Sequence, residues 1–240
     1  MQEDLKLGHH ISHKYDEELE AIRTRVLTMG GMVEVQCKRG LKALVKGDSE
    51  LAARVASSDY EINDIEVAIN AQCTDILARR QPAASDLRLL VAIIRMSADL
   101  ERIGDEAEKI ARCAQLLAEG RASRAYQADT RHLGKRTLSM LRGALDAFAR
   151  LDVNGAIEIA GMDPEIDRDF EALTRLLISH MMEHPNAVSE LLRVNWCARA
   201  LERIGDHAVN ICEEVVFLVK GSDVRHLSIS EIRERFAAQT

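Results

Sequence analysis

A five-residue sequence, ERIGD, occurs twice in this chain, at 101–105 and again at 202–206. Similar residues surround both copies in the same order. The matching pairs include Asp48 with Asp152, Ile62 with Ile166, and Pro82 with Pro185. The spacing between matched residues changes only in short connections, where insertions cost little. An internal repeat of this kind predicts two copies of one structural unit.

The composition predicts that this unit is built from helices. Hydrophobic residues make up 47% of the chain, but aromatic residues only 3%. Strand-rich proteins draw on aromatic and β-branched residues, whereas Ala, Leu, Glu and Arg, all abundant here, favour helices. Apolar residues also recur at spacings of three and four, as in a helix that buries one stripe. The first stripe contains Leu19, Ile22, Val26, Met29 and Val33.

Turn residues divide each copy of the repeat into three long helices. In the first copy, Gly47 separates the first helix from a second, which is expected to run unbroken over 51–76. Pro82 blocks further continuation of that second helix. Ser85 is expected to cap the third helix, and Gly120 to end it.

We therefore predict an all-α protein made of two pseudo-symmetric three-helix bundles. The first bundle is expected over residues 1–123 and the second over 124–221, followed by a short amphipathic tail over 222–240. Each apolar stripe needs partner helices to cover it, which is why three helices form one unit.

Charge and cysteine content exclude several classes of protein. The net charge of −7 and pI near 5.7 argue against binding nucleic acid, which requires a basic surface. No uninterrupted apolar run approaches the roughly 18 residues of a membrane span, and no signal peptide is apparent. The five cysteines contain no C-x-x-C pair and are interpreted as reduced core residues of a cytoplasmic protein.

The glycine of each ERIGD motif requires an explanation. Inside a helix, Gly costs about 1 kcal/mol relative to Ala. Gly104 and Gly205 must therefore permit an approach closer than a Cβ atom would allow. The approaching group is either a neighbouring helix or a ligand, and we favour tight helix packing.

The two acids of each motif lie four residues apart on one helix face. Glu101 and Asp105 form the first pair, and Glu202 and Asp206 the second. Like charges so placed destabilise a helix by a few tenths of a kcal/mol, which suggests a positive partner. The arginine inside each motif points elsewhere, so an arginine partner would have to come from another helix. A metal ion is the other candidate, and a solvated charged face is the alternative without a ligand.

Further acids precede these pairs in the chain. They are Asp59 in the first copy and Asp163 and Asp167 in the second, while Asn63 takes the place of an acid in the first. Asp163 is followed by a proline, a combination common at helix starts, so it is equally well explained as an N-cap.

Oxygen ligands alone favour a hard cation such as Mg²⁺, Mn²⁺ or iron over Zn²⁺. The E-x-x-H pattern of di-iron bundles does not occur in the sequence. His207 directly follows Asp206, but Glu106 is its counterpart in the first copy, so we do not assign it to the site. A phosphate-binding glycine loop, a nucleophile elbow and a Cys/His nucleophile pair are also not apparent, so an enzyme is not indicated.

Two stretches resemble the signature helices of the PhoU family of phosphate-transport accessory proteins. They are ASDLRLLVAIIRMSADLERIGDEAEKIA and ARALERIGDHAVNICEEVVFLVKG, and the resemblance extends over residues 10–222. It implies two three-helix bundles, in agreement with the repeat, and multinuclear metal clusters bound by E/D-x-x-x-D motifs. Carried over to this chain, the metal ligands are Asp59, Glu101, Asp105, Asp163, Asp167, Glu202 and Asp206. Mg²⁺, Mn²⁺ and iron are the expected metals, with Zn²⁺ as a further candidate.

The resemblance also implies a role in signalling. Proteins of this family are negative regulators of the phosphate-starvation response and are thought to bridge the transporter ATPase (PstB) and the membrane sensor kinase (PhoR). We therefore expect a cytoplasmic homodimer that reaches the inner membrane only through these partners. A metal-carboxylate enzyme or a metal storage protein is the alternative function.

Overall fold

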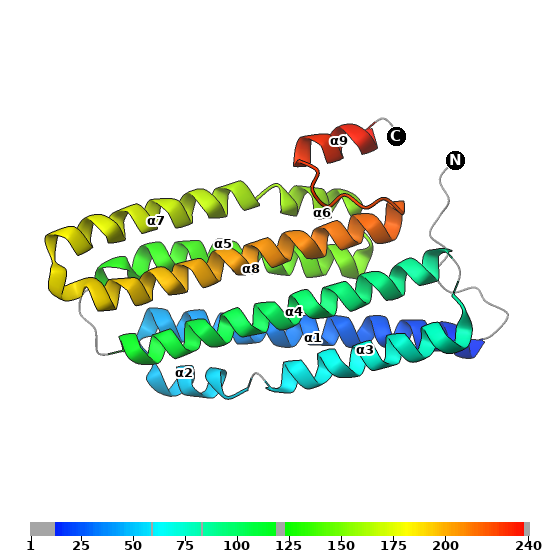
Figure 1. The fold of residues 1–240 in the computed structure, drawn as a ribbon, viewed down its shortest axis with the longest axis horizontal. Coiled ribbons are helices and arrows are strands. Elements are labelled where there is room, and N and C mark those ends of the chain that lie inside the picture. Colours follow the sequence, from blue (N-terminus) through cyan, green and yellow to red (C-terminus); the bar gives the residue numbers. More distant parts are fainter. Residues whose placement is uncertain (1–12, 59, 83, 119–122, 238–240) are drawn as a thin grey trace.

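The computed structural model describes residues 13–58, 60–82, 84–118 and 123–237, and within these ranges it contains helices and no strand (Figure 1). This confirms the predicted all-α class. The first half of the chain forms α1 (His13–Lys46), α2 (Ser49–Ala56), α3 (Tyr60–Arg80) and α4 (Ala84–Leu117). The second half forms α5 (Gln127–Arg150), α6 (Val153–Ala160), α7 (Asp163–Glu183), α8 (Val188–Lys220) and α9 (Ile229–Ala237). Two short 3₁₀ turns, Ser123–Tyr126 and Pro185–Ala187, precede α5 and α8.

The middle helix of each bundle is broken, so the prediction of one helix over 51–76 is wrong. In the first half, α2 ends at Ala56, and the hydroxyls of Ser57 and Ser58 donate hydrogen bonds back to carbonyls of the helix. Such side-chain bonds compete with helix continuation. In the second half, the same break separates α6 from α7. The expected cap Ser85 is the second residue of α4, and Gly120 lies outside the described residues.

The two halves repeat the same local contacts as well as the same elements. Asp48 caps α2 by accepting a hydrogen bond from the Leu51 amide at 2.9 Å. Asp152 caps α6 in the same way, accepting from the Gly155 amide at 2.9 Å. The internal repeat found in the sequence therefore extends to the way in which α2 and α6 are capped.

Four long helices occupy the centre of the molecule. Figure 1 shows α4 and α8 side by side, with α1 and α5 behind them. The α2–α3 segment covers one side of this layer, and α6–α7 covers the other. Buried apolar residues from both halves form one continuous core, so the two three-helix bundles are fused along their central helices.

Polar contacts connect α4 to α8 along a line that we call the seam. Residue numbers along α4 rise as those along α8 fall, so the two helices are antiparallel. The contacts are Arg88 Nε to the Leu218 carbonyl (3.3 Å), Arg95 to Glu214 (3.1 Å), Asn210 to Asp99 (2.9 Å), His207 to Asp99 (2.9 Å) and Arg203 to Glu106 (3.0 Å). Asp99, Glu106 and Glu214 are buried, and burial without these partners would be costly.

The C-terminal tail forms the amphipathic helix that the sequence indicates. Ile232 of α9 is buried against a small apolar cluster that includes Val153 of α6 and Val216 of α8. Among the described residues, the helices all fall short of the combination of length and apolar character that crossing a bilayer requires.

The two aspartate caps should stabilise the protein to a similar extent. Replacing Asp48 or Asp152 with Ala should lower the free energy of unfolding by about 1 kcal/mol, because an amide at the helix start loses its acceptor. Asn, which offers the same acceptor, should retain most of the stability. Urea denaturation followed by circular dichroism measures this. Asp64→Ala, at an exposed position inside α3, is the control, and cap variants as stable as this control would contradict the prediction.

Candidate metal centre

Four of the predicted ligands come together in the second half of the molecule. Asp163 and Asp167 lie on the first turns of α7, and Glu202 and Asp206 lie on α8, which packs against α7. Each acid of α8 has its pKa raised in part by the negative charge of the acids of α7. The helices therefore place four carboxylates from two separate segments into one cluster, which we call the second-half cluster.

Glu202 is the most buried member of the second-half cluster, with 7% of its surface exposed. Its Oε1 accepts a hydrogen bond from Arg199 at 2.6 Å, but its buried Oε2 has no hydrogen-bond partner among the described residues. Burial, followed by the negative charge of Asp206, raises the pKa of Glu202 to about 7, although Arg199 opposes the shift. A carboxylate in this position would gain from a cation.

Asp163 is in a similar situation. Its Oδ1 is buried and has no hydrogen-bond partner in the part of the chain that the structure describes. Burial, followed by the charges of Asp167 and Asp206, raises its pKa to about 6. The N-cap explanation of Asp163 does not hold, because Met162 occupies the N-cap position and Asp163 is the first residue of α7.

Asp206 lies at the exposed rim of the cluster. Desolvation by the surrounding protein and then the charge of Asp167 raise its pKa, which Arg199 opposes. These shifts have one physical origin, since desolvation and like charges both disfavour the ionised form of a carboxyl group.

Gly205 faces the start of α7 and the acid cluster. A Cβ atom built on Gly205 would lie 3.4 Å from Ile166 Cδ1 and 3.7 Å from Asp163 Oδ1. These are ordinary contact distances, which Ala would also make. The prediction that Gly205 permits an approach closer than a Cβ atom would allow is therefore wrong.

The chemistry of the second-half cluster fits a hard cation. Its donors are all carboxylate oxygens, two of which are buried without a hydrogen-bond partner among the described residues. Within those residues, however, groups of three or more His, Cys, Asp or Glu side chains arranged to hold a metal ion do not occur. Binding would therefore require these side chains to rotate toward a common point.

The first-half residues can be placed only in part. Glu101 and Asp105 lie half-buried on α4, and Asn63 lies half-buried on α3. Asp59 lies outside the described residues, so the geometry of a first-half cluster is not defined by the structure.

Two sequence-based expectations about the acids need correction. The alternative of a solvated charged face does not hold for Glu202, which is buried. Its arginine partner was expected from another helix, but Arg199 lies three residues earlier on α8 itself. The E-x-x-x-D spacing shows which acids share a face, whereas burial depends on the neighbouring helix.

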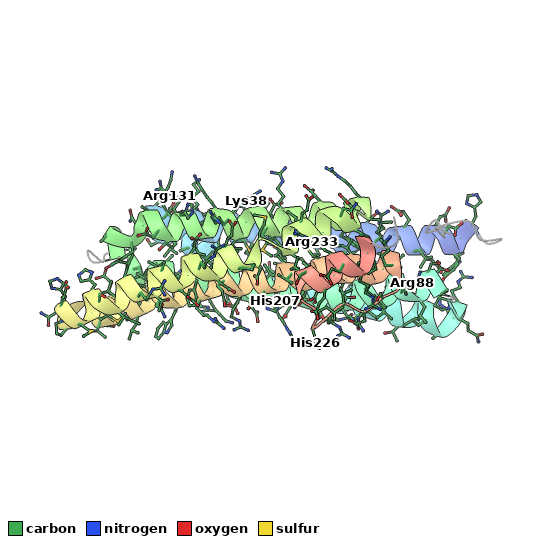
Figure 2. All side chains as sticks on the ribbon, turned by 90° about the horizontal axis from the view of Figure 1, so that it is seen from above. Lys38, Arg88, Arg131, His207, His226 and Arg233 are labelled. Carbon is green, nitrogen blue, oxygen red and sulfur yellow. The ribbon has the colours of Figure 1, made fainter. Side chains whose placement is uncertain are left out.

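His207 contacts α4 and does not join the second-half cluster. Its Nδ1 is 2.9 Å from Asp99 Oδ1 across the seam, and Figure 2 shows this residue about midway along the molecule. This contact could not be predicted from the repeat, because Asp99 and His207 are not corresponding positions of it. His207 therefore belongs to the seam and not to the donor set.

Two three-helix units around one core, with a buried carboxylate cluster, define an all-helical repeat protein. The family model of the PhoU domain matches this chain twice, at residues 26–114 and 130–215. The chain therefore belongs to the PhoU family.

Named relatives match over nearly their full length. The phosphate-specific transport system accessory protein PhoU homolog of Pseudomonas aeruginosa is 48% identical, with 95% of this chain and 94% of the relative covered. The PhoU protein of Escherichia coli is 43% identical over 99% and 98%. The crystal structure of PhoU from P. aeruginosa matches with a TM-score of 0.84 and 47% identity, over 87% of this chain and 100% of the other.

The raised pKa of Glu202 predicts how the metal-free protein responds to pH. Between about pH 4.5 and 7, Glu202 holds a proton in the folded state that it has released in the unfolded state. Its contribution to the free energy of unfolding is therefore fully present below about pH 4.5 and is lost as the pH rises through about 7. The whole shift corresponds to at most roughly 3 kcal/mol. Chemical denaturation at pH 5, 6.5 and 8 with a chelator should show this loss for wild type and a smaller loss for Glu202→Gln. Glu50→Gln, at an exposed position, is the control; equal slopes in all three proteins would contradict the prediction.

Proposed function

We propose that this protein is a phosphate-signalling adaptor that accompanies a phosphate-specific transporter. The observation that carries the proposal is its near full-length similarity to proteins named phosphate-specific transport system accessory proteins. In this role it binds the transporter ATPase and a membrane sensor kinase in the cytoplasm. When phosphate is plentiful, it keeps the kinase from switching on the phosphate-starvation genes.

A binding role agrees better with the acid cluster than catalysis does. The donors are carboxylates alone, and the neighbouring His207 is already bonded to Asp99. Hydrolytic and redox metal sites commonly include histidine and a sheltered open position. The cluster lies where α7 packs on α8, so a cation there would hold two helices together. We therefore propose a structural role for the metal, and a homodimer as the active form.

The proposed metals are Mn²⁺, Mg²⁺ or iron, with Zn²⁺ as a less suitable fourth. Asp163, Asp167, Glu202 and Asp206 would hold the cation in the second half. A bound cation would favour the ionised carboxylates and remove the cost of their mutual repulsion. The corresponding site of the first half would be weaker, because Asn63 supplies no negative charge.

Calorimetric titration with Mn²⁺ tests the metal proposal. Glu202→Ala/Asp206→Ala should abolish the tighter binding event or weaken it by more than about tenfold, because two ligands are lost. Glu101→Ala/Asp105→Ala should spare the tighter event. Glu50→Ala/Asp146→Ala removes two exposed acids outside both clusters and is the matched control. Equal affinity of wild type and all variants would rule out binding at these carboxylates.

Deletion of the gene in its host tests the adaptor role. An alkaline phosphatase reporter should become active in high phosphate, since the kinase loses the partner that restrains it. Single Glu101→Ala or Glu202→Ala substitutions should keep at least part of the repression, because an adaptor depends on its surface more than on one ligand. Immunoblots must show normal protein levels. A reporter that stays silent in the deletion strain would refute the adaptor role.

A further inference from the structure

Three large apolar side chains are exposed together at one end of the seam. They are Leu116 on α4 and Leu192 and Trp196 on α8, and we call them the seam patch. Leu116 is 64% exposed, and Trp196, the only tryptophan of the chain, is 58% exposed. Large apolar surfaces left in water on a folded protein often mark binding sites.

The register of α4 against α8 brings these residues together. Beyond the Glu106–Arg203 ion pair, the next contact along the seam joins the thiols of Cys113 and Cys197. Leu116 is one turn beyond Cys113, and Trp196 directly precedes Cys197. The patch therefore lies where the last turns of α4 pass the first turns of α8 (Figure 1).

Cationic side chains lie within two turns of the seam patch along α4 and α8. Lys109 and Arg203 both pair with Glu106 at the seam, and Arg112 pairs with Glu108. These cations are 46% to 65% exposed, whereas Glu106 and Glu108 are only 4% and 21% exposed. A partner would therefore meet mainly positive groups here, although the chain carries a net charge of −7.

We infer that the seam patch is a docking site for an acidic protein segment that carries an apolar anchor. The inference rests on the proposed adaptor function and assigns the segment to the transporter ATPase, because the similar proteins are named accessory proteins of a phosphate-specific transport system. Trp and Arg are the residues that most often dominate binding energy at interfaces, and complementary charge steers association.

Two other occupants fit the surface less well. A second copy of the chain docked patch to patch would place the same cations opposite each other, because a two-fold interface pairs identical surfaces. A broad anionic membrane would also meet the acids of a chain whose net charge is negative, including the exposed Asp206 near the seam. A narrow acidic segment lying along the seam avoids both repulsions.

Binding of the purified ATPase and of the kinase cytoplasmic region to the full-length protein tests the inference. Biolayer interferometry would measure Kd for wild type, Trp196→Gln and Arg112→Glu. Trp196→Gln should weaken binding of the ATPase by about tenfold or more, and Arg112→Glu should weaken it and flatten its dependence on salt. A loss of kinase binding alone would overturn the assignment to the ATPase. All substitutions are at exposed positions, and thermal melts would verify folding.

Matched controls lie on α3, away from the patch. Val67→Gln changes an apolar side chain as exposed as Leu116, and Arg79→Glu reverses an arginine paired four residues away, like Arg112. Both controls should bind like wild type. If wild type binds a partner and the patch variants bind it equally well, the docking site is wrong while the adaptor function stands.

The remaining outcomes are equally decisive. If wild type binds neither protein, the proposed function and the docking site both fail. Sedimentation velocity of Trp196→Gln tests whether the seam patch binds a second copy of the chain. If this variant loses a dimer that wild type forms, the patch is a self-association surface and the inference is overturned. Co-sedimentation with phosphatidylglycerol vesicles reports on a membrane. If Trp196→Gln loses vesicle binding but keeps both proteins, the inference is likewise overturned.

Discussion

The packing of α4 against α8 fixes the position of everything else in this protein. Each of these helices carries the ERIGD motif of its half, and their apolar stripes join the two halves into one core. Buried acids set the register between them. Asp99 on α4 contacts His207 and Asn210 of α8, and Glu106 pairs with Arg203 of α8 in addition to Lys109 of its own helix. Sliding one helix along the other would remove both of these partners from Asp99 and one of the two from Glu106, which is costly for buried charges.

Two sides of α8 make different contacts. One side carries Arg203 and His207 to α4, and another carries Glu202 and Gly205 to α7. Gly205 packs against the start of α7, where Asp163 lies near the acids of α8. The protein thus buries carboxylates that repel each other. Without a bound cation, this repulsion lowers the stability of the folded protein. Electrostatic strain of this kind is typical of functional sites.

The proposed docking surface is separate from the second-half cluster. The seam patch lies at the end of the seam, where Trp196 remains exposed, while Glu202 lies farther along α8 on the side facing α7. Arg199 follows Trp196 by one turn, but its guanidinium binds Glu202 and lies over the Phe170 ring of α7, so it belongs to the second-half cluster.

The sequence by itself determined the helical class, the internal repeat and the set of acids, because helix periodicity and the doubled ERIGD motif are local properties. It also predicted an approach at Gly205 closer than a Cβ atom allows, and the contact distances there contradict this. It did not reveal the break after Ala56, since two serines and the packing of short helices decided it. Nor did it reveal the burial of Glu202, or the exposure of Trp196 on a helix rich in apolar residues. Periodicity shows which residues share a face, but only the neighbouring helices decide which of those faces are removed from water.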